Sequence, residues 1–130
     1  MLIVPEALIA ELVTAEDAFG AIEACFAAMA RGDAYNFPVV REALGEGRQY
    51  GFKSGLDRAG AMLGVKAGGY FPGNMAKGLI NHQSSVLLFD PETGRPVAMV
   101  GGNLLTALRT GAASAISIDR LARRGARVLG

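Results

Sequence analysis

The chain has 130 residues, of which 51% are hydrophobic, with a net charge of +1 at pH 7 and a single cysteine. This length suits one domain with a real core, the near-neutral charge gives no indication of a nucleic-acid or membrane surface, and one cysteine excludes an internal disulfide framework. No stretch reaches the ~18 apolar residues of a membrane span and the N-terminus lacks the pattern of a signal peptide, so we expect a cytoplasmic protein.

The mean hydropathy of +0.29 is high for a freestanding monomer. Two interpretations stay open. An alanine-rich helical core would account for it, and so would apolar surface that is reserved for another subunit or another domain.

The N-terminal quarter predicts a short strand and two helices. Residues 2–4 form the strand, and a short helix follows. Thr14 and Asp17 fit a capping box that opens the second helix. Apolar residues then recur at helical spacing over residues 19–29, with Cys25 among them as an expected core residue. Gly32 occupies the usual position after a helix C-terminus.

The middle of the chain predicts a sheet. Side chains alternate over residues 39–43, and a Gly-Glu-Gly turn follows at residues 45–47. Further strands are expected at residues 50–56 and 61–67, before a glycine-rich loop from Gly68 to Gly78. Such a long loop in a compact domain tends to be functional.

The last third predicts a hairpin and a long helix. Residues 84–90 form a strand, residues 91–94 form a turn with proline early and glycine last, and residues 96–100 pair back. An alanine-rich helix follows from about Leu104 to Arg123, and residues 126–130 begin like another strand. The predicted fold is therefore α+β, with N-terminal helices, a mixed or antiparallel sheet and a long C-terminal helix.

Two cations lie in segments that contain no acidic residue. Lys66 stands in the middle of a predicted strand, between Val65 and Ala67. Arg109 lies in the first turns of the last helix, where the helix dipole disfavours a positive charge. Either side chain could be solvated surface, but a charge in apolar surroundings needs a partner. An anionic ligand is a reasonable candidate for that partner.

Arg41 stands on an alternating strand and is suited to binding a carboxylate through two hydrogen bonds, although a surface arginine is equally ordinary there. His82 is the only histidine, so the chain cannot form a multi-histidine metal site. It could act as a general acid or base or be structural. Asn81 and Gln83 could donate hydrogen bonds to a ribose or phosphate. The chain contains neither a Gly-x-Gly-x-x-Gly fingerprint nor a P-loop.

Five segments together resemble the ornithine cyclodeaminase/mu-crystallin family of NAD(P)-dependent oxidoreductases. These are Val65-Lys66, Gly69-Tyr70-Phe71-Pro72-Gly73-Asn74, Gly78-Leu79, His82-Gln83-Ser84-Ser85-Val86-Leu87-Leu88-Phe89 and Leu105-Thr106-Ala107-Leu108-Arg109-Thr110. The resemblance implies a two-domain enzyme whose first domain binds substrate and forms a homodimer by joining its sheet to the partner's. Residues 1–125 would be that domain. Residues 126–130 would be the first strand of a Rossmann domain that this chain does not contain.

Carried over position by position, the resemblance implies that Arg41, Lys66 and Arg109 bind the substrate's carboxylates. Lys66 would also manage a proton. Asn81, His82 and Gln83, together with Arg109, would face the nicotinamide end of NAD, although Asn81 replaces the hydroxyl residue of several relatives. No residue is implied as a metal ligand.

The implied reaction adds a hydride from NADH to the carbon of an amino-acid-like imine. A dicarboxylic imine suits three converging cations, and reduction of iminosuccinate to aspartate is the reaction that this version of the motifs favours. Three alternatives stay open. One is an ornithine-type cyclodeaminase, which releases ammonia and would need an acid near the substrate amine. The second is a non-catalytic ligand-binding module, like mu-crystallin, which binds hormone. The third is an isolated domain that only dimerises.

Overall fold

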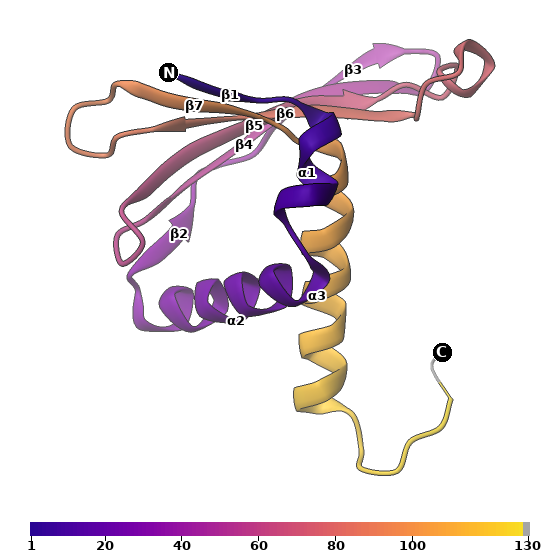
Figure 1. The fold of residues 1–130 in the computed structure, drawn as a ribbon. Coiled ribbons are helices and arrows are strands. Elements are labelled where there is room, and N and C mark those ends of the chain that lie inside the picture. Colours follow the sequence, from indigo (N-terminus) through magenta and orange to yellow (C-terminus); the bar gives the residue numbers. More distant parts are fainter. Residues whose placement is uncertain (129–130) are drawn as a thin grey trace.

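The computed structural model describes residues 1–128, in which one seven-stranded sheet carries three α-helices on one of its faces (Figure 1). The elements run in the order β1 (Leu2–Val4), α1 (Glu6–Leu12), α2 (Ala15–Arg31), β2 (Ala34–Asn36), β3 (Val40–Gly45), β4 (Arg48–Asp57), β5 (Met62–Tyr70), the 3₁₀ turn Met75–Lys77, β6 (His82–Phe89), β7 (Pro96–Gly101) and α3 (Asn103–Leu121). The predicted α+β class is confirmed.

The sheet is mixed. Its strand order is β1-β7-β6-β5-β4-β2, and β3 also pairs with β4. Only β1 runs parallel to its neighbour β7; the other described pairs are antiparallel. The predicted hairpin between β6 and β7 is present. The carboxylate of Asp90 accepts the backbone N–H groups of Glu92 and Thr93 at 2.9 and 3.0 Å, which holds the turn closed.

The ends of α2 follow the local sequence. The Thr14 hydroxyl accepts the N–H of Asp17 at 3.1 Å, and the Asp17 carboxylate accepts the N–H of Thr14 at 2.9 Å, so the predicted capping box is confirmed. Gly32 ends the helix in the left-handed conformation, with φ 82°. Cys25 is half-buried, so its prediction as a core residue holds only in part. Phe26 and Met29 of the apolar stripe of α2 stay 44% and 39% exposed.

The start of α3 is held from a distance. Its N-cap, Gly102, has no side chain that could cap the helix. The Glu6 carboxylate caps it instead, by accepting hydrogen bonds from the N–H groups of Asn103 and Leu104 at 3.0 and 2.7 Å. Gly102 packs against β6 so closely that a Cβ there would lie 2.7 Å from the Ser84 hydroxyl oxygen. These contacts fix the first turns of α3 against α1 and the centre of the sheet.

Most predicted strands differ from the observed ones by up to three residues at an end, and two differences concern the site or the sheet. The loop expected over residues 68–78 starts later, because Gly68 and Gly69 continue β5 and pair with Ser84 and Gln83 of β6. A Cβ at Gly68 would lie 2.7 Å from the Ser84 Cα, so glycine permits the close strand approach here rather than breaking the strand. The short strand β2 was not predicted.

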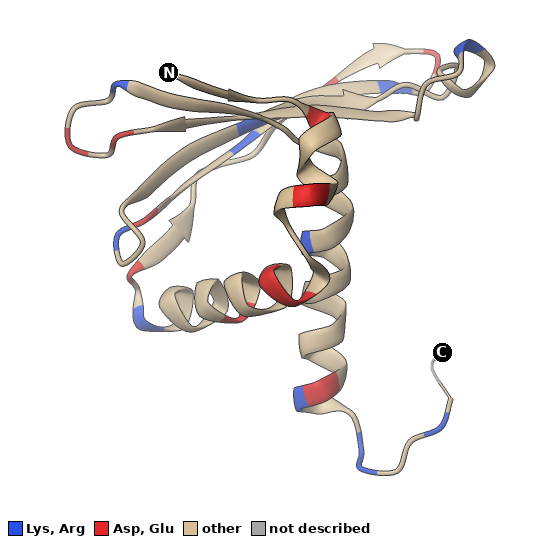
Figure 2. Cartoon of the chain, viewed as in Figure 1, with Lys and Arg blue, Asp and Glu red and all other residues tan. Residues whose placement is uncertain are grey.

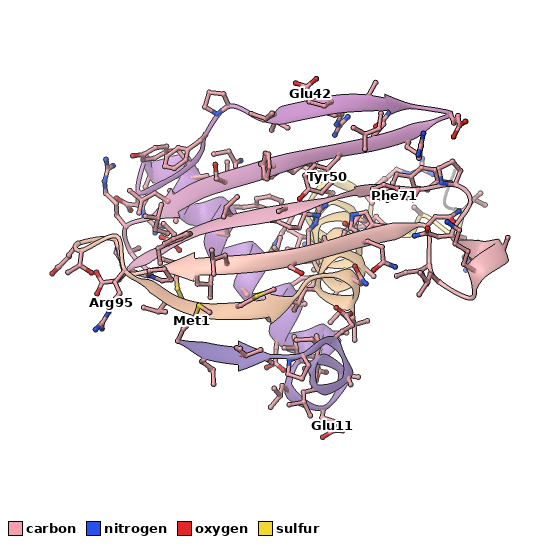
Figure 3. The ribbon with its side chains drawn as sticks, turned by 90° about the horizontal axis from the view of Figure 1, so that it is seen from above. Met1, Glu11, Glu42, Tyr50, Phe71 and Arg95 are labelled. Carbon is pink, nitrogen blue, oxygen red and sulfur yellow. The ribbon has the colours of Figure 1, made fainter. Side chains whose placement is uncertain are left out.

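The two faces of the sheet differ. The core lies between the helices and around them, where the buried side chains of the described residues are Ile9, Ala18, Ala28, Ala34, Ala112 and Ile116. No helix covers the opposite face (Figures 1 and 3). The strand register places apolar side chains there, including Val65, Leu87 and Met99, and Met99 is 42% exposed.

No helix within residues 1–128 is long and apolar enough to cross a membrane. Residues 122–128 form neither helix nor strand. The strand predicted over residues 126–130 is therefore absent from its first three residues, and its last two lie outside the described residues. The domain boundary at residue 125 stays a prediction.

Candidate active site

A cleft of about 290 Å³ opens between the helix-facing side of β3–β6 and the first turns of α3. Four of the predicted site residues line it: Arg41, Lys66, His82 and Arg109. They come from four different elements that lie side by side only in the folded chain.

Strand register explains why these side chains share one face. Gly51 of β4 lies opposite Arg41 on one side and Gly68 on the other. Lys66 is two residues from Gly68, and His82 faces Tyr70, also two residues away. Since side chains alternate along a strand, all of these positions point to the same side. Gly51 and Gly68 carry no side chain, which leaves the floor of the cleft open between the cations.

Lys66 is held by α3. Its ammonium group donates to the Thr106 hydroxyl at 3.0 Å, and that hydroxyl donates to the carbonyl oxygen of Gly102 at 2.7 Å. Partial burial lowers the pKa of Lys66, and the positive charges of Arg109 and Lys53 lower that pKa further. A lysine with a lowered pKa gives up a proton more readily than an exposed one.

No Asp or Glu among residues 1–128 lines the cleft. The ion pairs within residues 1–128 join Arg31 to Asp33, Arg48 to Glu46, and Arg120 to Glu23 and Asp119, all away from the cleft. Figure 2 shows positive positions on the central strands above the helices, with further Lys and Arg positions on turns and at helix ends. The cleft is therefore a positive site that is suited to an anion.

His82 is half-buried at the start of β6, two residues before the predicted start of this strand. Burial lowers its pKa, and the charges of Lys66, Arg109 and Lys53 act in the same direction. Near neutral pH the imidazole is therefore uncharged, and it can both donate and accept a hydrogen bond beside the cleft.

Asn81 and Gln83 do not line the cleft. The Asn81 amide donates to the Tyr70 hydroxyl at 3.3 Å and its oxygen accepts the N–H of Met75 at 3.3 Å. The Gln83 amide donates to the Ile80 carbonyl at 2.9 Å, and its oxygen accepts from the Asn103 amide at 3.3 Å. In this structure both side chains organise the β5–β6 loop and the start of α3. A contact with a cofactor stays a prediction for each.

Two cleft residues escaped the sequence analysis, Lys53 and Thr106. Lys53 lies in a predicted strand, but only the pairing of β4 with β5 shows that it stands opposite Lys66. Thr106 precedes Arg109 by almost one helical turn, and this spacing could have indicated that both face the same side. No three His, Cys, Asp or Glu side chains gather as metal ligands within the described residues.

Comparisons with known proteins give this cleft a context. The sequence profile of the ornithine cyclodeaminase/mu-crystallin family matches residues 2–130. Iminosuccinate reductase of Paracoccus denitrificans is 66% identical over 131 residues, which cover 100% of this chain and 41% of that protein. Alanine dehydrogenase of Archaeoglobus fulgidus is 33% identical over 129 residues, which cover 99% of this chain and 39% of the relative.

Solved structures agree with the sequence comparison. The crystal structure of the Paracoccus denitrificans enzyme with NAD⁺ matches with a TM-score of 0.91 at 65% identity, over 100% of this chain and 41% of that one. The structure of Thermococcus litoralis Δ¹-pyrroline-2-carboxylate reductase with NADH and L-proline matches with a TM-score of 0.92 at 28% identity, over 98% of this chain and 40% of that one.

The chain thus spans about 41% of the length of the first relative. Both the sequence profile and the fold extend over nearly all of its residues, and the motifs at Lys66, His82 and Arg109 lie together in one cleft. This chain belongs to the ornithine cyclodeaminase/mu-crystallin family.

Proposed function

We propose that this chain is the substrate-binding part of an NAD-dependent imine reductase that converts iminosuccinate to aspartate. The observation that carries the proposal is the acid-free group of Arg41, Lys66 and Arg109 around one cleft. The similarity to iminosuccinate reductase along the whole chain supports the same reaction. Within residues 1–128, the cleft offers no acid that could hold a substrate amine, as a cyclodeaminase would require.

The cations have separate tasks. Arg41 and Arg109 carry planar guanidinium groups, which bind carboxylates through paired hydrogen bonds. Lys66 is the catalytic residue of the proposal, since its ammonium group is held at a fixed place by Thr106 and carries a lowered pKa. NADH, when bound, supplies the hydride that the imine carbon takes up. Lys66 or an ordered water supplies the proton that the imine nitrogen requires as the amine forms.

The residues of the cleft fit one end of the cofactor. His82 and Arg109 lie where a nicotinamide amide could meet an imidazole and a guanidinium, and Asn81 and Gln83 border the same strand end. The sequence has no glycine fingerprint for the pyrophosphate. We therefore place residues 1–125 in the substrate domain and assign residues 126–130 to the start of a dinucleotide-binding domain.

We also propose that the protein is a homodimer joined through the uncovered face of the sheet. Apolar side chains with no covering layer are costly to leave in water. Met99 and Phe52 are each 42% exposed, and Tyr50 is 38% exposed. The archaeal alanine dehydrogenase, which matches with a TM-score of 0.91, is a dimer with bound NAD.

The proposed reaction can be tested with the full-length gene product. NADH oxidation is followed with oxaloacetate and ammonia, which form iminosuccinate in solution. Wild-type protein should oxidise NADH, and the double variant Arg41→Ala, Lys66→Ala should lose at least about 100-fold in kcat/KM, since two charge-assisted contacts are removed. Arg95→Ala, on the β6–β7 turn, is the matched control. Unchanged turnover by the double variant would refute the site.

Ornithine serves as the competing substrate in the same assay. A cyclodeaminase would release ammonia from ornithine without net consumption of NADH. The proposal expects no such release. A ligand-binding module without activity would instead bind dicarboxylates and consume no NADH with any imine.

A further inference from the structure

Lys53, which the family motifs do not include, is a cation of the same cleft, and no ion pair within residues 1–128 includes it. We infer that Lys53 is a specificity-determining residue that binds the second carboxylate of the substrate. It would thereby select dicarboxylic imines over imines with one carboxylate or with an amine side chain. The inference rests on the proposed function, because it names the substrate class of that same cleft.

The position of Lys53 follows from the β4–β5 register. Lys53 lies directly opposite Lys66, and both line the cleft. Residues directly opposite in an antiparallel pair have Cβ atoms ~4.5–5.5 Å apart, and like charges there destabilise the sheet. Lys53 is exposed and Lys66 is half-buried, so water solvates part of this charge, and an anion beside the two ammonium groups would relieve their repulsion.

No ion pair in the described part of the chain includes Lys53 or Lys66, and the carboxylates that take part in its ion pairs belong to other regions. Asp17, the acid that lines the neighbouring cavity, is bound to Thr14 instead. Within residues 1–128, the side-chain hydrogen bond of Lys66 goes to the neutral Thr106 hydroxyl. The effect of Lys53 is felt within the cleft, where its charge contributes to the lowered pKa values of Lys66 and His82.

The surroundings of Lys53 direct its charge. A second cavity, of about 450 Å³, lies between the sheet, α2 and α3. Most of its lining is apolar, including Ile22, Val86 and Leu105, although Asp17 and Arg109 also line it. Lys53 and Lys66 border both spaces. The methylene stem of a lysine packs well on apolar surface, and the charge of Lys53 acts on His82, which lines the cleft and not the second cavity.

The number of cations matches the number of charges to be bound. One carboxylate occupies the guanidinium groups of Arg41 and Arg109. A second carboxylate on the same short carbon chain then meets Lys53 beside Lys66. A substrate with a methyl group at that end would leave the Lys53 charge unpaired, and a substrate with an ammonium group would be repelled.

The substrate preference of the full-length protein tests the role of Lys53 directly. The preference is the ratio of kcat/KM for iminosuccinate to kcat/KM for the imine of pyruvate, which has a single carboxylate. Lys53→Met removes the charge and keeps the length of the side chain. We expect the ratio to fall roughly 10- to 100-fold in Lys53→Met, the range for loss of one hydrogen bond to a charged group. Reduction of the pyruvate imine should change little.

Two further variants sharpen the test. Lys53→Arg keeps the positive charge and should retain most of the preference. Arg95→Met, at the opposite end of the sheet from Tyr50 and the cleft (Figure 3), removes one charge elsewhere and should leave the ratio unchanged. If Lys53→Met fails to fold, inhibition of the wild type tests whether the cleft binds a second carboxylate. Succinate should inhibit at least about tenfold more strongly than butyrate, which has the same length and one carboxylate.

The outcomes separate the two proposals. A wild-type protein that reduces neither imine contradicts the proposed function. A wild type that prefers iminosuccinate, with an equal preference in Lys53→Met, contradicts the role of Lys53 alone. Equal inhibition by succinate and butyrate contradicts the role of Lys53 as well.

Discussion

Removing the Glu6 carboxylate should loosen α3, the helix that carries Thr106 and Arg109 to the cleft. Glu6 accepts two backbone N–H groups at the start of α3, from Asn103 at 3.0 Å and from Leu104 at 2.7 Å. N-cap replacements cost ~0.5–2 kcal/mol, and a carboxylate at a helix N-terminus adds ~0.3–1 kcal/mol through the dipole. Because two N–H groups in half-buried surroundings lose a charged acceptor, Glu6→Ala should lower the free energy of local opening by about 2 kcal/mol.

Amide hydrogen exchange measures this loss of local stability at the first turn of α3. A drop of about 2 kcal/mol in opening free energy speeds exchange roughly 30-fold, and we expect this at the amides of the first turn of α3. Glu11→Ala is the matched control, because Glu11 lies on the same helix α1 and its exposed side chain points away (Figure 3). Glu6→Gln should fall between wild type and Glu6→Ala. Identical exchange in Glu6→Ala and wild type would refute the capping role.

Three further predictions concern the proton, the pH and the interface. Thr106→Val removes the hydroxyl that accepts a hydrogen bond from the Lys66 ammonium group. It should therefore lower the pKa of Lys66 and move the alkaline limb of the kcat/KM profile to lower pH. Thr106→Ser should return the limb to its wild-type position, and a limb that does not move in Thr106→Val would contradict the coupling. The folded pKa of His82 is depressed below 6.5, so the unfolded chain takes up this proton first and stability falls as the pH drops below 6.5. Melting temperatures of His82→Gln should therefore depend less on pH there than those of wild type, and parallel curves would count against this. Met99→Glu should halve the mass measured by light scattering if the open sheet face joins two subunits; an unchanged mass would place the interface elsewhere.

Local signals predicted most of the elements. The capping box at Thr14, the glycine that ends α2 and the Pro-to-Gly turn before β7 each depend on residues within a few positions. The structure confirms all three. The short strand β2 has too few residues for a visible alternation, and its pairing with β4 depends on residues about twenty positions away.

The errors at Gly68 and Gly69 have a different origin. Glycine is disfavoured in strands, so a pair of glycines reads as a loop. Here the neighbouring backbones of β4 and β6 come so close that no Cβ fits. This packing is a property of the sheet and has no counterpart in the local sequence.

The candidate site was predicted in part for the same reason. Unpaired charges in uncharged segments identified Lys66 and Arg109, which do line one cleft. The pairing of β4 with β5 and the contact of β5 with α3 join residues that are far apart in the sequence. Only the structure therefore shows that Lys53 and Thr106 line the cleft. The same long-range order places His82 in the cleft and turns Gln83 away from it.

A crystal structure of the full-length protein with NAD⁺ and L-aspartate tests the central claim most directly. We predict that the aspartate carboxylates lie within hydrogen-bond distance of Arg41, Lys53 and Arg109, that its amine lies beside Lys66, and that the nicotinamide faces His82. Aspartate bound outside this cleft, or bound there with its carboxylates turned away from these cations, would contradict the account.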